Sequence, residues 1–245
     1  MKNKKWLIVL ITVCAIAVIV AIVVGVNLNK KSDEDLLIEQ LAAELASQNL
    51  KGEDPEEDED ITRAVIKNNG NSKLVDITRI SPNKNSPRNH EIDTITIGII
   101  PEKRSIESLG ELFSKTKSQA SSNYGVDNDG RIGMYVEEKD RSWRNGSRAN
   151  DNRAITIVVS SDFYAPYEVS DAAYKSLINL VTDICKRNGI KKLVWKDSKE
   201  DRLNRVDGAN MTVRRDFANV ADPGEYLYSR MGDIANKVNE KLGAN

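Results

Sequence analysis

Histidine and cysteine are almost missing from this chain of 245 residues, which has one of the former and two of the latter. With His90 as its only imidazole, a conventional histidine-based metal centre or acid–base catalyst is nearly excluded. Cys14 lies in an apolar run and Cys185 in a predicted helix, so we expect no disulfide between them. The chain therefore does not have the pattern of a small secreted domain held together by disulfides.

An excess of one charge sign is also missing from the chain as a whole, since its formal net charge is −1. That sum hides an acidic stretch: residues 32–60 hold twelve acidic side chains and one basic one, Lys51. Residues 61–245 hold thirty basic and twenty-five acidic side chains. This small excess of positive charge does not distinguish an anionic wall polymer from a nucleic acid as the partner. A solvated surface that mixes both signs of charge is enough to explain it. We expect no nucleic-acid partner.

The one long hydrophobic run, residues 6–26, contains no charged side chain. At about 1.5 Å per residue it spans roughly 30 Å, the thickness of the hydrocarbon core of a bilayer. Three lysines precede the run and two follow it, which favours a cytoplasmic N-terminus and an extracellular body. We therefore predict a cytoplasmic tail (1–5) and a single-pass transmembrane helix (6–28) in the cell membrane. A cleaved signal peptide is the alternative, although no A-x-A-like site follows Gly25.

Residues 29–72 have the composition of a stalk. Ser32 and the acids after it are typical of a helix start, and leucines recur at helical spacing up to Ser47. A short dimerising coil is possible, but the pattern covers less than two heptads. Residues 52–60 are acidic and hold no apolar side chain, so we expect them to be extended.

Residues 73–245 alternate between β-type and α-type patterns, which predicts one α/β domain with a central mixed β-sheet flanked by helices. Ser170 and the Asn188-Gly189 pair mark the start and end of one helix. The expected strands are 95–100, 131–136, 154–159 and 192–195, and the expected helices are 106–113, 170–188 and 225–242.

Five stretches of this body carry a family resemblance: SPNKNSPRNHEIDTITI (81–97), SQASSNYGVDNDGRIGMYVEEKDRSW (118–143), ANDNRAITI (149–157), LINLVTDICKRNGIKKL (177–193) and MTVRRDFANVADPGEY (211–226). Together they resemble the type-2 N-acetylmuramoyl-L-alanine amidases, whose fold is shared with the peptidoglycan recognition proteins. The likeness runs from about residue 73 to residue 243 and looks closest to the clostridial and phage branch. It implies the α/β fold predicted above and peptidoglycan or its stem peptide as the partner.

The resemblance places a zinc site at residues that differ from the family pattern. Its members hold zinc with two histidines and a cysteine and activate water with a glutamate, and the matching positions here are Gly98, Arg214, Asp222 and Val158. Gly98 and Val158 offer no donor atom, and Arg214 has no lone pair to give. Asp222 alone does not make a catalytic zinc site. We therefore predict no catalytic residue, no metal ligand and no cofactor.

Two further predictions concern the substituted site. Because the positions of family ligands converge, Arg214 and Asp222 are expected to form an ion pair there, with Asp216 as a competing partner for Arg214.

Asn123, Tyr124, Trp143 and Asn152 lie in motifs that match the family around its cleft, and they are the candidate substrate-binding residues. A role in holding the fold is equally open for them. A basic cluster beside Trp143 is a candidate grip for stem-peptide carboxylates, or an exposed charged loop; its members are Arg141, Arg144, Arg148 and Arg153.

The sequence thus predicts a membrane-anchored, catalytically inactive amidase-like protein that binds peptidoglycan or a cell-wall partner. One alternative is an active zinc N-acetylmuramoyl-L-alanine amidase that hydrolyses the muramoyl–L-alanine bond. Another is a module that binds only protein, with a partner that the sequence does not name.

Overall fold

The computed structural model describes residues 70–244. The predicted membrane helix, the acidic tract and the predicted stalk up to residue 69 lie outside the described residues. Within residues 70–244, no helix is both long enough and apolar enough to cross a bilayer.

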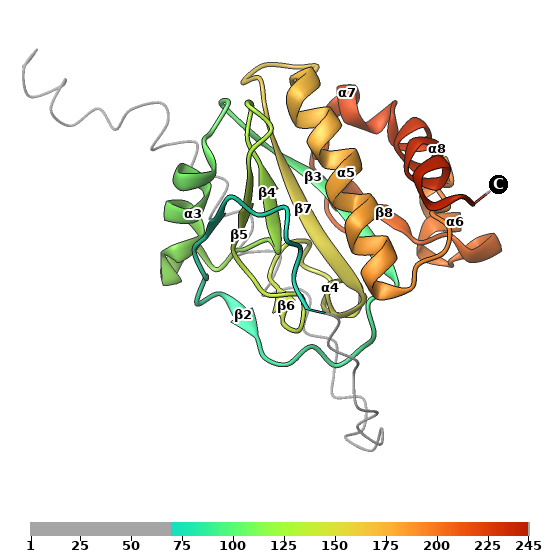
Figure 1. Ribbon diagram of the computed structural model, residues 1–245, viewed down its shortest axis with the longest axis horizontal. Coiled ribbons are helices and arrows are strands. Elements are labelled where there is room, and N and C mark those ends of the chain that lie inside the picture. The colour runs from blue at the N-terminus through green and yellow to red at the C-terminus, as the bar shows by residue number, and fades with distance from the viewer. Residues whose placement is uncertain (1–69, 245) are drawn as a thin grey trace, which may run out of the picture. The chain divides into compact units, whose positions relative to one another are not determined.

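The centre of the body is a six-stranded mixed sheet (Figure 1). The two long strands, β3 and β7, pair in parallel over eight residues, whereas β4 and β5 pair antiparallel. In spatial order the strands are β1 (Ile77–Thr78), β5 (Ile132–Met134), β4 (Tyr124–Val126), β7 (Ala154–Ser161), β3 (Thr94–Pro101) and β8 (Met211–Val213). A separate small sheet joins β2 (Lys84–Asn85) to β6 (Arg141–Ser142). The predicted mixed sheet is confirmed.

Helices flank this sheet. The described α-helices are α3 (Ile106–Ser114), α4 (Arg148–Arg153), α5 (Asp171–Asn188), α6 (Lys199–Leu203), α7 (Gly224–Tyr228) and α8 (Met231–Leu242), and the 3₁₀ turns are η1 (Thr116–Ser118), η2 (Val206–Gly208) and η3 (Arg214–Asp216). The predicted limits of α5 are confirmed, because Ser170 accepts a hydrogen bond from Ala173 N and Gly189 ends the helix at φ 73°.

Two sequence predictions are wrong near the C-terminus. Residues 192–195 form no strand, since the N–H groups of Leu193 and Val194 donate to the side chains of Asn239 (2.7 Å) and Asn210 (2.8 Å). The helix expected over 225–242 is broken between α7 and α8. At the break, Ser229 Oγ donates to Glu225 O (2.8 Å), which is the backbone competition typical of serine.

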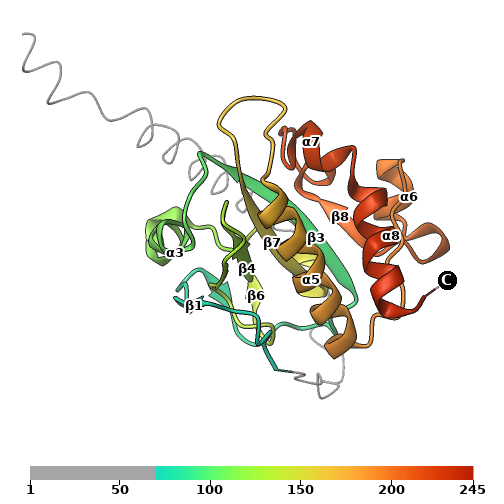
Figure 2. The same cartoon turned by 45° about the horizontal axis from the view of Figure 1, so that its top comes forward.

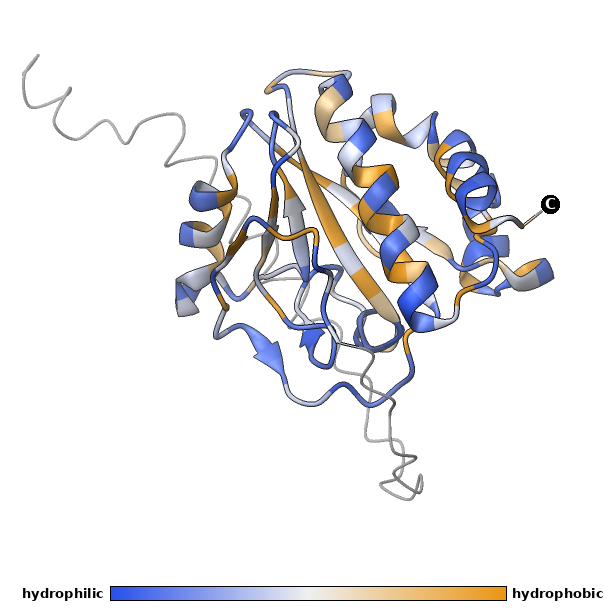
Figure 3. Ribbon diagram, viewed as in Figure 1, coloured by the Kyte–Doolittle hydropathy of each residue, from blue (hydrophilic) through white to orange (hydrophobic). Residues whose placement is uncertain are grey.

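The sheet has one apolar face. Ile95, Ile97 and Ile99 of β3 belong to the main core cluster together with Ile157 of β7 and the inner side chains of α5 and α8. Figures 1 and 2 show α5 and α8 side by side over this face. In Figure 3 the strands beneath them are largely hydrophobic and the outer helix surfaces are largely hydrophilic. Each fully buried isoleucine contributes about 1.5–3 kcal/mol, so this face supplies much of the stability.

The opposite face of β3 is polar and is held by hydrogen bonds. Thr96 Oγ1 lies 2.7 Å from Thr212 Oγ1 of β8. Asn150 of α4 donates to Thr96 Oγ1 (3.0 Å) and accepts from Thr212 Oγ1 (3.0 Å). This triangle fixes α4 against the polar face.

A buried carboxylate, Glu138, ties the sheet to the end of α5. Its side chain accepts from the Tyr124 hydroxyl (2.6 Å), from Arg187 Nη2 (2.5 Å) and from Asn188 Nδ2 (2.9 Å). Burial, followed by the Glu138 charge, raises the pKa of Tyr124. The phenol therefore stays protonated and remains a donor.

We expect Glu138→Ala to lower the free energy of unfolding by about 1–3 kcal/mol, because it leaves the buried Tyr124 hydroxyl without its acceptor and removes one of the two carboxylates that pair with Arg187. The measurement is denaturant unfolding of the full chain. Glu137→Ala is the matched control, since Glu137 forms a part-exposed pair with Lys139 (3.0 Å) and should cost less than about 1 kcal/mol. Equal losses for the two variants would contradict the role of Glu138.

Candidate functional site

The sheet register brings the four positions of the family's zinc site together. Gly98 of β3 and Val158 of β7 are register partners. Strand β8 ends at Val213, the partner of Ile97, so Arg214 begins η3 beside Gly98. Asp222 returns to the same place, because its Oδ1 accepts a hydrogen bond from Ile99 N (2.9 Å).

The partner of Asp222 is Arg144, so the predicted Arg214–Asp222 ion pair is wrong. Arg144 Nη2 contacts Asp222 Oδ2 and donates to Ile99 O (3.2 Å). The two side chains are only 3% and 9% exposed. Arg144 lies in the loop between β6 and α4. This loop places the Arg144 guanidinium where the family pattern has a metal ion.

Gly98 provides the space for this ion pair. A Cβ atom at position 98 would lie 2.6 Å from Arg144 Nη2 and 2.7 Å from Asp222 Oδ1. Real Cβ contacts are essentially never that short, so any larger residue at position 98, histidine included, would have to displace the pair. The ion pair in this geometry therefore depends on the glycine at position 98.

Asp151 of α4 positions the loop that carries Arg144. Its Oδ2 accepts from the backbone N–H groups of Arg144 (3.2 Å) and Asn145 (3.1 Å), and its Oδ1 accepts from the Asn145 amide (2.6 Å). Burial raises the pKa of Asp151, and the hydrogen bonds from Asn145 act against that shift. The loop is thus tied to the polar face by a buried carboxylate.

The competing acid, Asp216, has a different arginine. Arg202 binds it through Nη2–Oδ1 (2.5 Å) and Nε–Oδ2 (3.0 Å), and both side chains are buried. The Arg202 guanidinium also lies 4.2 Å from the centre of the Trp195 ring. Arg214 itself is buried at the start of η3.

Three of the four candidate substrate-binding residues hold the fold. Asn123 is fully buried and accepts from Thr156 N (3.1 Å). Tyr124 belongs to the core cluster under the helices, on the face of the sheet opposite to the Gly98 site. Asn152 is buried and accepts from Asn89 N (3.1 Å). Binding of a ligand through them stays a prediction.

Trp143 is the partly exposed member of the set. Its indole Nε1 donates to Asn85 Oδ1 (2.6 Å), and Arg141 donates to the same oxygen. Asn85 thereby holds an aromatic ring and a cation side by side.

The four arginines of the expected basic cluster separate into two kinds. Arg144 and Arg153 are each paired with a carboxylate of the fold, Asp222 and Asp93. Arg141 and Arg148 form no ion pair within residues 70–244. Burial lowers the pKa of Arg141; nearby Asp151 opposes this shift and Arg148 adds to it. Only these two remain as candidates for an external anion.

The residues present do not fit a zinc ion. Of the four positions, only Asp222 has donor oxygens, and these are engaged by Ile99 N and by Arg144. The described part of the chain holds no group of three or more histidine, cysteine, aspartate or glutamate side chains placed to share a metal. A catalytic zinc needs three protein ligands and an open position, and a buried guanidinium stands in the way.

The dependence between Gly98 and the ion pair predicts coupled mutational effects. Gly98→Ala should lower the free energy of unfolding by about 1–3 kcal/mol through overpacking, and Arg144→Ala by about 3–5 kcal/mol because it leaves Asp222 buried without a cation. In the double variant the added methyl meets no guanidinium, so the loss should fall short of the sum of the two single losses. Denaturant unfolding measures this double-mutant cycle. Strict additivity would show that Gly98 does not serve the pair.

Comparisons with known proteins identify the domain. The family model described as Amidase_2, N-acetylmuramoyl-L-alanine amidase, matches residues 58–224. A mutant endolysin from Bacillus subtilis is a structural relative at 13% identity and a TM-score of 0.50, covering 67% of this chain and 99% of that one.

Two further structures are also similar. The N-acetylmuramoyl-L-alanine amidase LysC from Clostridium intestinale has 14% identity and a TM-score of 0.47, with 69% of this chain and 98% of that one covered. A Se-Met AmpD derivative has 17% identity and a TM-score of 0.49, with 70% and 99% covered. The search of curated proteins found no match. By the family match over residues 58–224, the chain belongs to the Amidase_2 family of N-acetylmuramoyl-L-alanine amidases.

Proposed function

We propose that this chain is a non-catalytic member of its family, which binds peptidoglycan or a cell-wall partner without cutting it. The observation that carries the proposal is the buried Arg144–Asp222 ion pair over Gly98. Anchoring by residues 6–28, with the body outside the cell membrane, is part of the same proposal.

Chemistry at the site supports the absence of hydrolysis. Zinc catalysis depends on a metal that lowers the pKa of bound water from about 15.7 to about 7. A guanidinium can neither ligate a cation nor accept a proton, and Val158 supplies no base. Freeing Asp222 for a metal would also break a buried pair, at a cost of about 3–5 kcal/mol. The residues of this site therefore hold the loop in place and do not activate water.

Binding is supported by partly or fully exposed groups in β6, in the loop that carries Arg144 and at the start of α4. Trp143 offers part of an aromatic surface to a sugar ring or a peptide, and its orientation is fixed by Asn85. Arg141 and Arg148 offer donors that suit the carboxylates of a stem peptide. The family match supplies the peptidoglycan context.

We expect the purified full chain to contain no stoichiometric zinc and to release no product from muropeptides. Elemental analysis and chromatography of the digested muropeptides measure this. A variant that combines the family's ligands and base with removal of the arginine (G98H, V158E, R214H, D222C and R144A) should bind about one zinc per chain. Turnover by the natural chain that a chelator abolishes would establish the alternative, an active zinc amidase.

We also expect the full chain to sediment with insoluble peptidoglycan. The double variant Arg141→Ala with Arg148→Ala should bind at least about tenfold more weakly, since each charge-assisted hydrogen bond contributes about 1.5–3 kcal/mol. The matched control removes two exposed cations elsewhere, Lys115 and Lys117, and should leave binding unchanged. If the natural chain does not sediment with the wall, the peptidoglycan half of the proposal is wrong.

A further inference from the structure

The loop between β7 and α5 carries the most exposed large apolar side chain of residues 70–244. Tyr164 is 77% exposed and Phe163 is 38% exposed, and Ala165 and Pro166 after them are exposed as well. Figure 2 shows this loop projecting beyond the end of the sheet. Single exposed apolar side chains are ordinary in soluble proteins, but four in succession at the tip of a loop form a small apolar surface.

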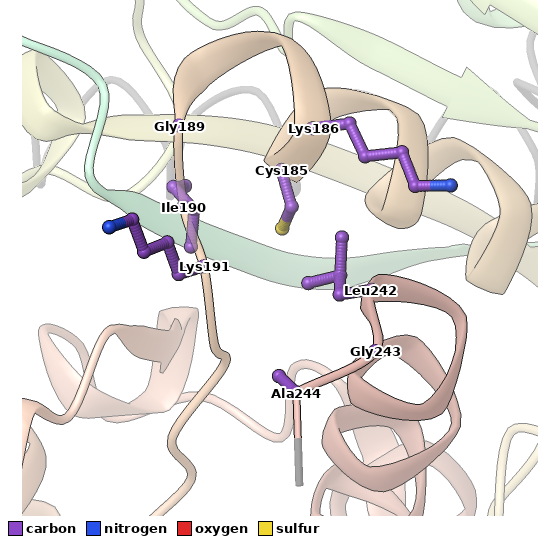
Figure 4. Close-up of a pocket in the computed structure, with 8 residues that line it drawn as sticks. All are labelled: Cys185, Lys186, Gly189, Ile190, Lys191, Leu242, Gly243 and Ala244. Carbon is purple, nitrogen blue, oxygen red and sulfur yellow. The ribbon is translucent and has the colours of Figure 1, made fainter.

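The pocket at the C-terminal ends of α5 and α8 offers no comparable surface (Figure 4). Cys185 and Ile190, which line it, are both buried. Helix α5 begins after the loop, and its 18 residues extend over about 27 Å, so the pocket lies at the far end of the helix. An external apolar group therefore finds open rings at Phe163 and Tyr164 and not at this pocket.

Hydrogen bonds hold the exposed loop in one conformation. Asp162 N donates to Glu168 O (2.8 Å) and closes the loop at its base. Tyr226 N of α7 donates to Pro166 O (3.1 Å) and ties the tip to the neighbouring segment of the body. A surface that is already ordered loses little conformational entropy when it binds a ligand.

The two aromatic rings are also fixed against each other. Their centroids are 4.6 Å apart and their planes meet at 79°, an edge-to-face arrangement. Tyr167 N donates to Tyr164 O (2.9 Å), which fixes the backbone that carries the outer ring. Because Tyr164 is so exposed, its ring presents open aromatic surface to solvent in a defined orientation.

The charges around the rings argue against an anionic ligand. Residues 161–174 contain three acidic side chains and no lysine or arginine. The lysine next to the loop, Lys103, is paired with Asp162 (2.8 Å). Nucleic acids and anionic membrane surfaces are bound by clusters of lysine and arginine. A neutral ligand suits this loop better.

The size of the tip argues for a small unit of that ligand. A stable protein–protein interface uses about 20–30 residues on each side, whereas the tip has four. A sugar ring has about the size of one aromatic ring. Its C–H groups carry a partial positive charge, which the negative face of an aromatic ring attracts.

The loop also lies at the end of the sheet where a ligand is expected. Strands β3, β7 and β8 are parallel, so the loops that follow them gather at one end, and ligands of α/β sheets bind beyond the carboxyl ends of the strands. Val158, the register partner of Gly98, is three residues before the last residue of β7, Ser161. The loop therefore begins about 10 Å along the strand from the Gly98 site.

We propose that Phe163 and Tyr164 form a stacking site for a neutral sugar ring of the glycan strand of peptidoglycan. The choice of polymer rests on the proposed function. The rings bind the sugar part of the wall, and Arg141 and Arg148 bind the carboxylates of its stem peptide. The two contacts are separate and can be removed independently.

Saturation-transfer NMR with a soluble glycan tests the stacking site directly. With the full chain and tetra-N-acetylchitotetraose, an oligomer of N-acetylglucosamine, saturation of aromatic protons should pass to the sugar C–H protons. The double variant Phe163→Ala with Tyr164→Ala should lower this signal at least about fivefold. The matched control, Leu203→Ala with Val206→Ala, removes two other exposed apolar side chains and should leave it unchanged. Absence of transfer, or equal transfer in the two double variants, would overturn the proposal.

Conservative variants distinguish stacking from plain apolar contact. Tyr164→Phe keeps the aromatic face and should bind the oligomer as the natural chain does. Tyr164→Leu keeps an apolar side chain without that face and should bind about fivefold more weakly. Full binding by Tyr164→Leu would show that the ring is not stacked on a sugar and would overturn the proposal.

Sedimentation with peptide-free glycan strands separates this proposal from the proposed function. Removal of both rings should weaken this sedimentation about tenfold, and removal of Arg141 and Arg148 should leave it unchanged. A chain that sediments with the intact wall whether or not the rings are present would overturn the stacking site and leave the proposed function standing. Failure to sediment with the wall, together with ring-dependent transfer to the oligomer, would do the reverse.

Two other occupants of the loop have their own readouts. Self-association of the full chain that disappears with the rings, while sugar binding does not change, would overturn the proposal in favour of a second copy. A like result with neutral phosphatidylcholine vesicles would overturn it in favour of a lipid surface.

Discussion

The ion pair between Arg144 and Asp222 is the constraint on which the substituted site depends. It is buried, it uses both oxygens of Asp222, and it needs a residue without a side chain at position 98. A buried pair of this kind need not add net stability compared with apolar residues of the same size, but removing one partner is costly. A single substitution at any of these three residues is therefore expected to lower stability, and this includes a single substitution to one of the family's zinc ligands.

The fold tolerates this unit because stability and site chemistry lie on different faces of the sheet. The apolar face of β3 and β7 is covered by α5 and α8 and does not involve the Gly98 site. The polar face is held by the triangle of Thr96, Thr212 and Asn150 and by the Asp151 loop. The residues at the family's zinc-ligand positions can therefore differ while the hydrogen bonds of the polar face keep α4 and the Arg144 loop in place.

Sequence patterns predicted the parts that depend on local chemistry. The isoleucine-rich strand β3 and the Ser170 and Gly189 ends of α5 follow from periodicity and capping. Pairing over long range was not predictable in the same way: Arg144 and Asp222 are 78 residues apart, and no local pattern connects the two residues. The sequence did contain one signal: Gly98, Arg214 and Asp222 stand at positions that the resemblance places together. That signal indicated an altered zinc site but did not identify Arg144 as the partner of Asp222. Tyr124 lies on the face of the sheet opposite to the Gly98 site, because strand alternation, and not motif proximity, decides which face a side chain takes.

In the proposed function, the absence of a metal would remove the stabilisation of a transition state and leave ground-state binding, since the two are separate contributions in an enzyme. An active amidase releases the wall by cutting it. Under the proposed function, this chain binds the same polymer through Trp143, Arg141 and Arg148 without hydrolysing it, and would release it only by dissociation. The lifetime of the complex is then set by the dissociation rate alone. On that proposal the chain would act as a tether to the wall, and for a tether the strength of the binding contacts matters more than any catalytic group.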